Sequence, residues 1–256
     1  MELTNSLRKA VASLDKAKCR RELGWFKAEG TKCVLDTIAH FDVVALLATD
    51  AWLSSHRLDI APECVVKVTR ADMDRMTHLS TAPEVIAVYR IPDSRLSADS
   101  LRHGLTLALD GVQDPGNLGT IIRCADWFGI DNIICSHDTV DLYNPKVVMS
   151  TMGAISRVRV HYCDLPAMLE ALGDIPVYGT FLNGSNIYAS SLPACAVVVM
   201  GNEGKGISPE VERVINRRIT IPSFRGGDDG SESLNVAMAT AIVISEFKRS
   251  NSYGKN

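Results

Sequence analysis

The chain has 256 residues, of which 46% are apolar and 22% are charged, and this composition is typical of a globular protein rather than a disordered or fibrous one. No apolar run approaches the ~18 residues that a membrane span needs, and the polar N-terminus lacks a signal-peptide core, so we expect a cytoplasmic protein with no membrane partner. Seven cysteines and six histidines are scattered without the spacing of a disulfide framework or a metal site. We therefore expect no bound metal.

The net charge is −3 and the pI is about 6.1, which argues against a nucleic-acid-binding protein as a whole. Residues 1–32 differ, because they carry eight basic and four acidic side chains. A local basic surface can bind phosphates on an acidic molecule. The alternative interpretation is an ordinary solvated helix surface.

The first part of the chain alternates helical and strand-like patterns. In order, we expect a helix at 6–23, a strand at 25–29, a helix at 31–40, a strand at 42–49, a helical turn at 50–55, a strand at 64–68, a helix at 70–78 and a strand at 84–90. This alternation predicts an α/β domain over residues 1–93. A polar stretch without hydrophobic periodicity follows, and we interpret residues 94–104 as a linker.

The second part, residues 105–256, repeats the alternation with more uniformly apolar strands. The candidates are 105–109, 132–135, 157–160, 177–182, 196–200 and 218–221. Continuous apolar runs of this kind favour a parallel sheet covered by helices on both faces. Such sheets bind ligands beyond the carboxyl ends of their strands, so the chemistry is expected in the loops that follow these runs.

The loop after the strand at 105–109 reads DGVQDPGNLGTIIR over residues 110–123. Asn117 lies where the N-cap of the next helix is expected, and Arg123 projects from that helix. A guanidinium beside free helix N–H groups favours an anion such as a phosphate. The alternative is a capping asparagine and an arginine paired with a nearby carboxylate.

The loop after the strand at 196–200 reads GNEGKGISPE over residues 201–210 and matches neither common phosphate-binding motif. Glu203 would repel a pyrophosphate, so this glycine-rich loop better suits a ligand without phosphates, such as an adenosyl group or a cation. A third motif runs from Ile221 to the helix that Ser233 can cap, and it places Asn235 in the first turn of a mostly apolar helix. A buried amide there either satisfies loop carbonyls or orients a substrate.

The three motifs N-x-G-x-x-x-R, N-E-G-x-G-I-S and I-P…S-L-N-V-A, in this order, resemble the SpoU (TrmH) family of RNA ribose methyltransferases over about residues 105–250. The stretch RRELGWFKAEGTK resembles the L30e-like substrate-binding domain that precedes the catalytic domain in many members. The resemblance implies an α/β SPOUT-type catalytic domain with a deep trefoil knot, a homodimer, and S-adenosylmethionine as the cofactor. It implies methyl transfer to a ribose 2′-hydroxyl.

Residue by residue, the resemblance implies two sets of site positions. The catalytic positions are Asn117, Arg123, Glu203, Ser233 and Asn235. The cofactor-contacting positions are Thr180, Gly201, Ile221 and Leu234. Residues 223–232 form a glycine-rich, acidic loop that is longer than in the family pattern, so this sequence departs from the pattern beside the cofactor positions and not at the catalytic side chains.

For the N-terminal domain we expect RNA docking through basic residues within 8–32, with Arg20, Arg21 and Lys27 as the candidates. Trp25 and Phe26 are either stacking groups or core, and at least one of them is expected in the core. Ribosomal RNA is favoured as the substrate, and transfer RNA stays open.

Two other functions compete with this one. A dinucleotide-dependent oxidoreductase is disfavoured by the missing G-x-G-x-x-G motif and by Glu203. A non-catalytic RNA-binding assembly factor on the same fold is disfavoured by the complete set of catalytic positions.

Overall fold

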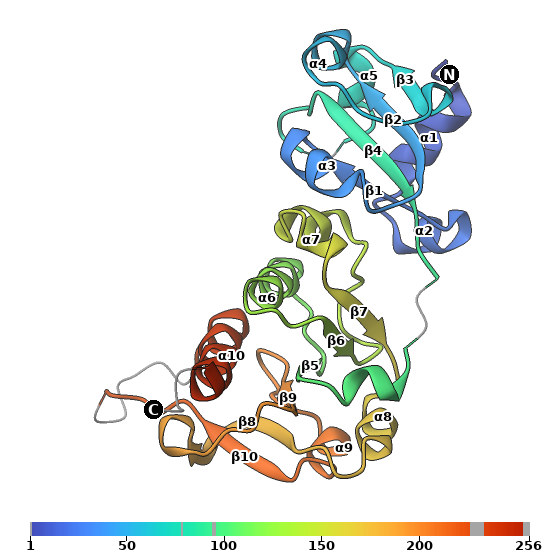
Figure 1. Cartoon of the computed structure of the whole chain (residues 1–256). Helices are drawn as coiled ribbons and strands as arrows, with labels where there is room; N and C mark the ends of the chain where they lie inside the picture. The colour runs from blue at the N-terminus through green and yellow to red at the C-terminus, as the bar shows by residue number, and fades with distance from the viewer. Residues whose placement is uncertain (1, 78, 94–95, 226–232, 253–256) are drawn as a thin grey trace. The chain divides into compact units, whose positions relative to one another are not determined.

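The computed structural model describes every residue except 1, 78, 94–95, 226–232 and 253–256. The chain divides into two compact units, one with residues 1–93 and 141–156 and the other with 94–140 and 157–256 (Figure 1). Residues 141–156, which we expected in the second domain, thus group with the first. In the described part of the chain, no helix is long and apolar enough to cross a membrane.

The first unit is a mixed α/β unit. In chain order it contains α1 (Asn5–Ser13), α2 (Ala17–Leu23), β1 (Trp25–Glu29), α3 (Thr31–Thr37), β2 (Val43–Ala48), α4 (Asp50–Ser55), the 3₁₀ helix η1 (Pro62–Cys64), β3 (Val65–Lys67), α5 (Arg70–Asp74), β4 (Val85–Arg90), α7 (Pro145–Ser150) and the 3₁₀ helix η3 (Ala154–Ser156). The sheet order is β1-β4-β2-β3, with β4 antiparallel to both neighbours and β2 parallel to β3.

The helix expected at 6–23 is in fact two helices. α1 ends at Ser13, and a new helix begins at Ala17. Asp15, in the turn between them, forms an ion pair with Lys27 of β1, so a tertiary contact fixes the turn. Gly24 then ends α2 in the left-handed conformation that glycine adopts without strain.

The second unit carries a six-stranded sheet in which every pair of neighbouring strands is parallel. Its elements are the 3₁₀ helix η2 (Ala98–Leu101), β5 (Leu105–Leu109), α6 (Pro115–Trp127), β6 (Asn132–Cys135), β7 (Arg159–Tyr162), α8 (Leu165–Ala171), β8 (Val177–Asn186), the 3₁₀ helix η4 (Ile187–Ala189), β9 (Ala196–Met200), α9 (Pro209–Glu212), β10 (Arg217–Thr220) and α10 (Val236–Ser252). The strand order is β10-β8-β9-β5-β6-β7. The α/β class and the parallel sheet are as predicted, whereas the knot implied by the resemblance stays a prediction.

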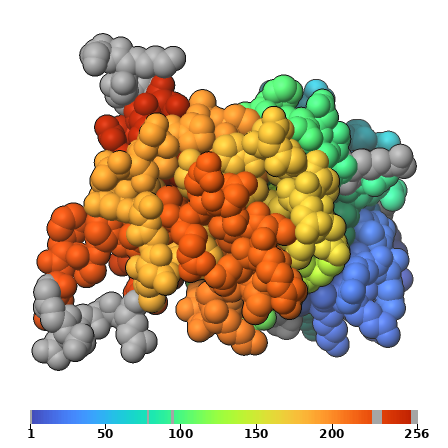
Figure 2. Space-filling model, turned by 90° about the horizontal axis from the view of Figure 1, so that it is seen from below, coloured from blue at the N-terminus to red at the C-terminus, as the bar shows by residue number. Residues whose placement is uncertain are grey.

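Helices cover both faces of this sheet, α6 and α10 on one and α8 and α9 on the other (Figure 1). Ala108, Val197 and Val199 point toward α8 and α9 and form one core cluster with Leu165 and Val211. Figure 2 shows this side of the unit, in yellow and orange. Because both faces are covered, the two central strands, β5 and β9, are buried at every position, and Thr106 is their only polar residue.

Candidate active site

Two loops of the candidate site begin side by side at the carboxyl edge of the second sheet. β5 and β9 are parallel neighbours, and their last residues, Leu109 and Met200, are register partners. The Asp110 N–H donates to the Met200 carbonyl at 2.9 Å, which extends the pairing one residue further. The loops that follow, 110–114 and 201–208, therefore start from one place although about 90 residues separate them in the sequence.

Asn117 lies in the first turn of α6 rather than at its cap. The N-cap is Asp114, whose carboxylate accepts the Asn117 N–H at 2.8 Å, and Pro115 is the first helical residue. Our expectation of a capping Asn117 was thus wrong by three residues. Because Asp114 caps the helix, the Asn117 side chain is free to make a tertiary contact.

Glu203 lies in a tight loop after β9. Asn202 and Gly206 exchange two backbone hydrogen bonds of 2.9 Å, which close residues 202–206 into a small hairpin. A Cβ at Gly201 would lie only 2.3 Å from the Gly206 carbonyl carbon, so only glycine fits where the two sides meet. The hairpin presents Glu203 at the surface.

Asn235 caps the helix that Ser233 was expected to cap. The Asn235 Oδ1 atom accepts the N–H groups of Ala237 at 3.0 Å and Met238 at 3.2 Å, and α10 begins at Val236. Asn235 is also exposed rather than buried. The register of the helix start was therefore two residues off, because an asparagine cap outcompetes the serine here.

Three side chains from these segments form one hydrogen-bonded line. Asn235 Nδ2 donates to Asn117 Oδ1 at 2.9 Å, and Asn117 Nδ2 donates to Glu203 Oε1 at 2.8 Å. The other end of the line is fixed as well, since Asn235 Oδ1 accepts from the start of α10. Both amides are therefore oriented by their partners. Glu203 and Asn235 are exposed and Asn117 is half-buried, so the line is open to a ligand at both of its ends.

Arg123 and Ser233 do not join this line. Both are exposed, and in the described part of the chain neither side chain forms a hydrogen bond or ion pair with Asn117, Glu203 or Asn235. Arg123 lies on α6 six residues after Asn117. Its guanidinium is therefore presented to solvent rather than held by the carboxylate of Glu203.

The sequence of this unit matches the model of a known family, the SpoU rRNA Methylase family, over residues 104–245. The chain belongs to the SpoU family. It is 29% identical over 231 residues, 89% of this chain and 90% of the relative, to the 23S rRNA (guanosine(2553)-2'-O)-methyltransferase RlmP of Bacillus subtilis (strain 168).

Solved structures of similar proteins extend the likeness to nearly the whole chain. A TrmH-family protein from Porphyromonas gingivalis is 38% identical with a TM-score of 0.86, covering 96% of this chain and 98% of that one. An AdoMet-bound rRNA methyltransferase from Sinorhizobium meliloti is 29% identical with a TM-score of 0.83, covering 98% of both chains. The N-terminal unit is thus shared with these SpoU-type structures and is not confined to this chain.

The four positions that the SpoU resemblance assigns to the cofactor lie on neighbouring strands or the loops after them. Thr180 is in β8, where its hydroxyl donates to the Val199 carbonyl of β9 at 3.1 Å. Gly201 follows β9, and Ile221 follows β10, the other neighbour of β8. Leu234 is 54% exposed directly before Asn235. Of the long loop expected at residues 223–232, positions 226–232 lie outside the described residues.

Two of the three RNA-binding candidates are unsuitable because they are buried. Arg20 is 2% exposed, and its guanidinium donates to the Leu14 carbonyl at 2.7 Å and to Asp141 at 2.9 Å. Lys27 is 1% exposed, so its ammonium cannot reach a ligand at the surface. Arg21 is exposed and stays a candidate.

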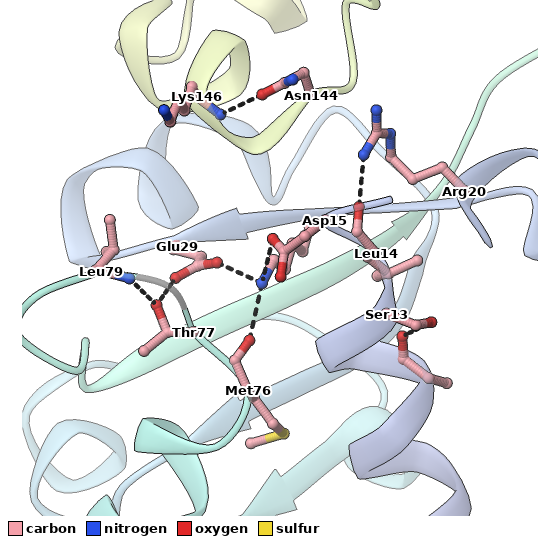
Figure 3. A network of polar contacts seen from close by, with 12 residues as sticks. Ser13, Leu14, Asp15, Arg20, Glu29, Met76, Thr77, Leu79, Asn144 and Lys146 are labelled. Atoms are coloured by element: carbon pink, nitrogen blue, oxygen red, sulfur yellow. Dashed lines mark hydrogen bonds and ion pairs between the residues drawn. The ribbon is translucent and has the colours of Figure 1, made fainter. Parts of the chain in front are cut away.

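The Lys27 ammonium is held by partners from three segments. It lies 3.1 Å from Asp15 and 2.7 Å from Glu29, and it donates to the Met76 carbonyl at 2.8 Å; these three partners are labelled in Figure 3. Its charge is thus neutralised inside the first unit. The neighbouring Phe26 is fully buried among Phe41, Tyr89 and Tyr143, which confirms that one of the two aromatics is core.

The sequence did not single out several residues that shape the site. Asp110 and Asn202 tie the two loops together, and Asp114 caps α6. Asp114 has a recognisable signal, an acidic residue directly before a proline that starts a helix. Among the described residues, no group of three or more His, Cys, Asp or Glu side chains could hold a metal ion.

Proposed function

We propose that the chain transfers a methyl group from S-adenosylmethionine to a ribose 2′-hydroxyl of ribosomal RNA. The observation that carries this proposal is the line Asn235–Asn117–Glu203, built from three distant segments at the carboxyl edge of a parallel sheet. Membership of the SpoU family and the similarity to ribosomal RNA methyltransferases support it.

The residues at the cofactor positions fit S-adenosylmethionine better than a phosphate-bearing nucleotide. Ile221 and the exposed Leu234 offer apolar surface for an adenine ring. Gly201 allows the backbone to approach closely, and the nearby Glu203 is a carboxylate, which attracts a sulfonium and repels a pyrophosphate. When bound, the cofactor supplies a methyl group attached to a positively charged sulfur, and this sulfur becomes a neutral thioether when the methyl group is transferred.

The protein's main task is to align the ribose hydroxyl and stabilise the negative charge that develops on its oxygen. We assign this charge stabilisation to Arg123, which is exposed and carries a cation that can also bind an RNA phosphate. A guanidinium stays protonated far above neutral pH, so it is a poor base. As the new carbon–oxygen bond forms, the hydroxyl proton passes to water or to the RNA phosphate.

The ribose hydroxyl and the methyl donor are aligned against the hydrogen-bonded line of Asn117, Glu203 and Asn235. The Asn117 amide holds Glu203 Oε1, and the α10 start holds Asn235, so each side chain has one defined orientation. Glu203 Oε2 and the exposed faces of the two amides stay available for a ligand. Ser233, also exposed, is assigned to the same edge.

We assign RNA docking to three exposed basic residues of the first unit, Lys16, Lys18 and Arg21. They lie on α2 or at its cap. Phosphate contacts of this kind make binding depend on salt. Arg20 and Lys27 have no part in this surface because their charges are already compensated internally.

We propose that the working form is a homodimer. α6 and α10 pack together, and each of them leaves a large apolar side chain exposed: Trp127 is 85% and Met238 61% exposed. A second copy of the chain would cover this surface.

The seven cysteines are free thiols in the structure, which is consistent with a reducing cytoplasm.

The function is tested by incubating the protein with methyl-labelled S-adenosylmethionine and, separately, with ribosomal and transfer RNA. We expect label in ribosomal RNA, in a 2′-O-methylated nucleotide, and its loss with Asn117→Ala. Label in transfer RNA alone would identify a transfer RNA enzyme. RNA binding without any transfer of label would favour an assembly factor.

A further inference from the structure

We propose that Asn202 is a positioning residue that sets the contact between Asn117 and Glu203. Its side chain ties the loop that carries Glu203 to the loop that leads to Asn117. This inference rests on the proposed function, because it concerns the geometry of the same site.

Every polar group of Asn202 is used. Its backbone N–H and carbonyl both bond to Gly206 at 2.9 Å. Its Oδ1 atom accepts the N–H groups of Gly204 at 2.9 Å and Lys205 at 3.0 Å. The shape of residues 202–206 is therefore determined largely by one side chain, and Glu203 is the residue directly after it.

The remaining group of Asn202 reaches across to the other loop. Its Nδ2 atom donates to the Gly111 carbonyl at 2.7 Å. The same Gly111 residue donates its N–H to Ser136 Oγ, in the loop after β6, at 2.8 Å. Gly111 has a φ of +71°, and a Cβ there would lie 3.1 Å from an Asp138 carboxylate oxygen. Gly111 is thus held in place between two loops and offers Asn202 a fixed anchor.

A second contact holds the far end of the Glu203 loop. Asp110, which is 5% exposed, accepts the Ser208 N–H through Oδ2 at 2.6 Å. Residues 202 and 208 are therefore both tied to the start of the loop after β5. Glu203 lies next to the first of these ties, so the Asn202 side chain controls its position most directly.

The contact that depends on this tie tolerates little displacement. Asn117 Nδ2 and Glu203 Oε1 are 2.8 Å apart, and a hydrogen bond is lost beyond about 3.5 Å. A misplacement of about 1 Å in a catalytic site can lower the rate about 100-fold. Loss of the Asn202 tie is therefore expected to lower kcat by roughly 10- to 100-fold while changing KM for S-adenosylmethionine less than about twofold.

Two variants separate the functions of the side chain. Asn202→Asp keeps the acceptor for Gly204 and Lys205 but replaces the donor to Gly111 with an oxygen. Asn202→Ala removes both. The matched control is Asn144→Asp, because Asn144 Oδ1 also accepts a backbone N–H, that of Lys146, in the first unit. The control is expected to keep wild-type kcat.

Steady-state kinetics and amide hydrogen exchange are measured on each variant of the full chain. We expect both Asn202 variants to lose kcat and to change the carbonyl ¹³C chemical shift of Gly111 in NMR spectra, because that carbonyl accepts from Asn202 Nδ2 in the wild type. The Gly204 and Lys205 amides should exchange faster only in Asn202→Ala. Wild-type kcat in both Asn202 variants would overturn the proposal, even with a lowered Tm, because the residue would then be merely structural.

A double-mutant cycle with Glu203→Gln tests whether Asn202 acts through Glu203. If it does, Asn202→Ala lowers kcat much less in the Glu203→Gln background than in wild type. Equal losses in both backgrounds would refute the positioning role. If the wild-type protein transfers no methyl group to any RNA, the proposed function fails. The tie itself is then judged by the carbonyl ¹³C chemical shift of Gly111, and an unchanged shift in both variants overturns it.

Discussion

Replacement of Lys27 by methionine should destabilise the first unit without changing how the protein binds RNA. The Lys27 side chain is fully buried, and its ammonium neutralises Asp15 and Glu29, whose side chains are 20% and 9% exposed. Methionine retains most of the volume of the side chain but removes the charge. Two carboxylates then face each other with no cation between them.

The expected cost follows from this burial. Breaking a buried ion pair by removing one partner costs about 3–5 kcal/mol, because an uncompensated charge stays buried. For a unit of about 100 residues, each 1 kcal/mol of lost stability lowers Tm by at least about 4 °C, so the loss of about 3–5 kcal/mol is expected to lower Tm by roughly 12–20 °C. Lys27→Met combined with Asp15→Asn and Glu29→Gln should recover much of this loss, because no charge is then left unpaired.

The assay pairs thermal denaturation with RNA binding at several salt concentrations. The control is Lys18→Met, since the Lys18 side chain is 81% exposed. We expect Lys18→Met to change stability by less than about 0.5 kcal/mol and to flatten the salt dependence of RNA binding. A wild-type Tm for Lys27→Met, together with a flatter salt dependence, would show that its ammonium contacts RNA and would refute this reasoning.

Four further outcomes are expected. Glu203→Gln should lower kcat by about 10²- to 10³-fold with an unchanged circular dichroism spectrum, and wild-type kcat would remove Glu203 from the catalytic set. Arg123→Lys should lower activity without moving an ionisation limb of the pH–rate profile; a limb shifted to lower pH with activity retained would instead favour direct base catalysis by arginine. Met238→Asp should convert a dimer into a monomer in light scattering, and an unchanged mass would place the interface elsewhere. Burial raises the pKa of Cys33 to about 11, so iodoacetamide should label it far more slowly at pH 8 in the folded than in the unfolded protein, as measured by mass spectrometry.

The sheet of the second unit was predictable because its strands are buried on both faces. Residues 105–109, 132–135 and 196–200 are strands at the expected bounds, since a continuous apolar run between turn residues has few other solutions. The edges were less predictable. β7 begins two residues later than expected, and β8 continues to Asn186 beyond its apolar part. Pairing with neighbouring strands, rather than side-chain type, decides where these strands end.

The site residues were found through motif order, but their local geometry was not. Asn117 was expected to cap α6 but lies three residues after the cap, and Asn235 was expected two residues after the cap of α10 but is itself the cap. Both predictions were displaced because several residues that can cap a helix lie close together in each segment. Asp114 competes with Asn117, and Asn235 competes with Ser233. Local propensity permits either register, and the contact between the two asparagines favours the observed one.

The charges of the N-terminal segment show most plainly what a sequence alone leaves open. Arg20 and Arg21 are adjacent, yet one is buried against Asp141 and the other is exposed. Their difference arises because α2 turns about 100° per residue, so that neighbouring residues point in different directions. The partner of Arg20 lies 121 residues away, beyond any local pattern. A basic segment therefore indicates how much positive charge is present, whereas tertiary pairing decides how much of it an RNA can reach.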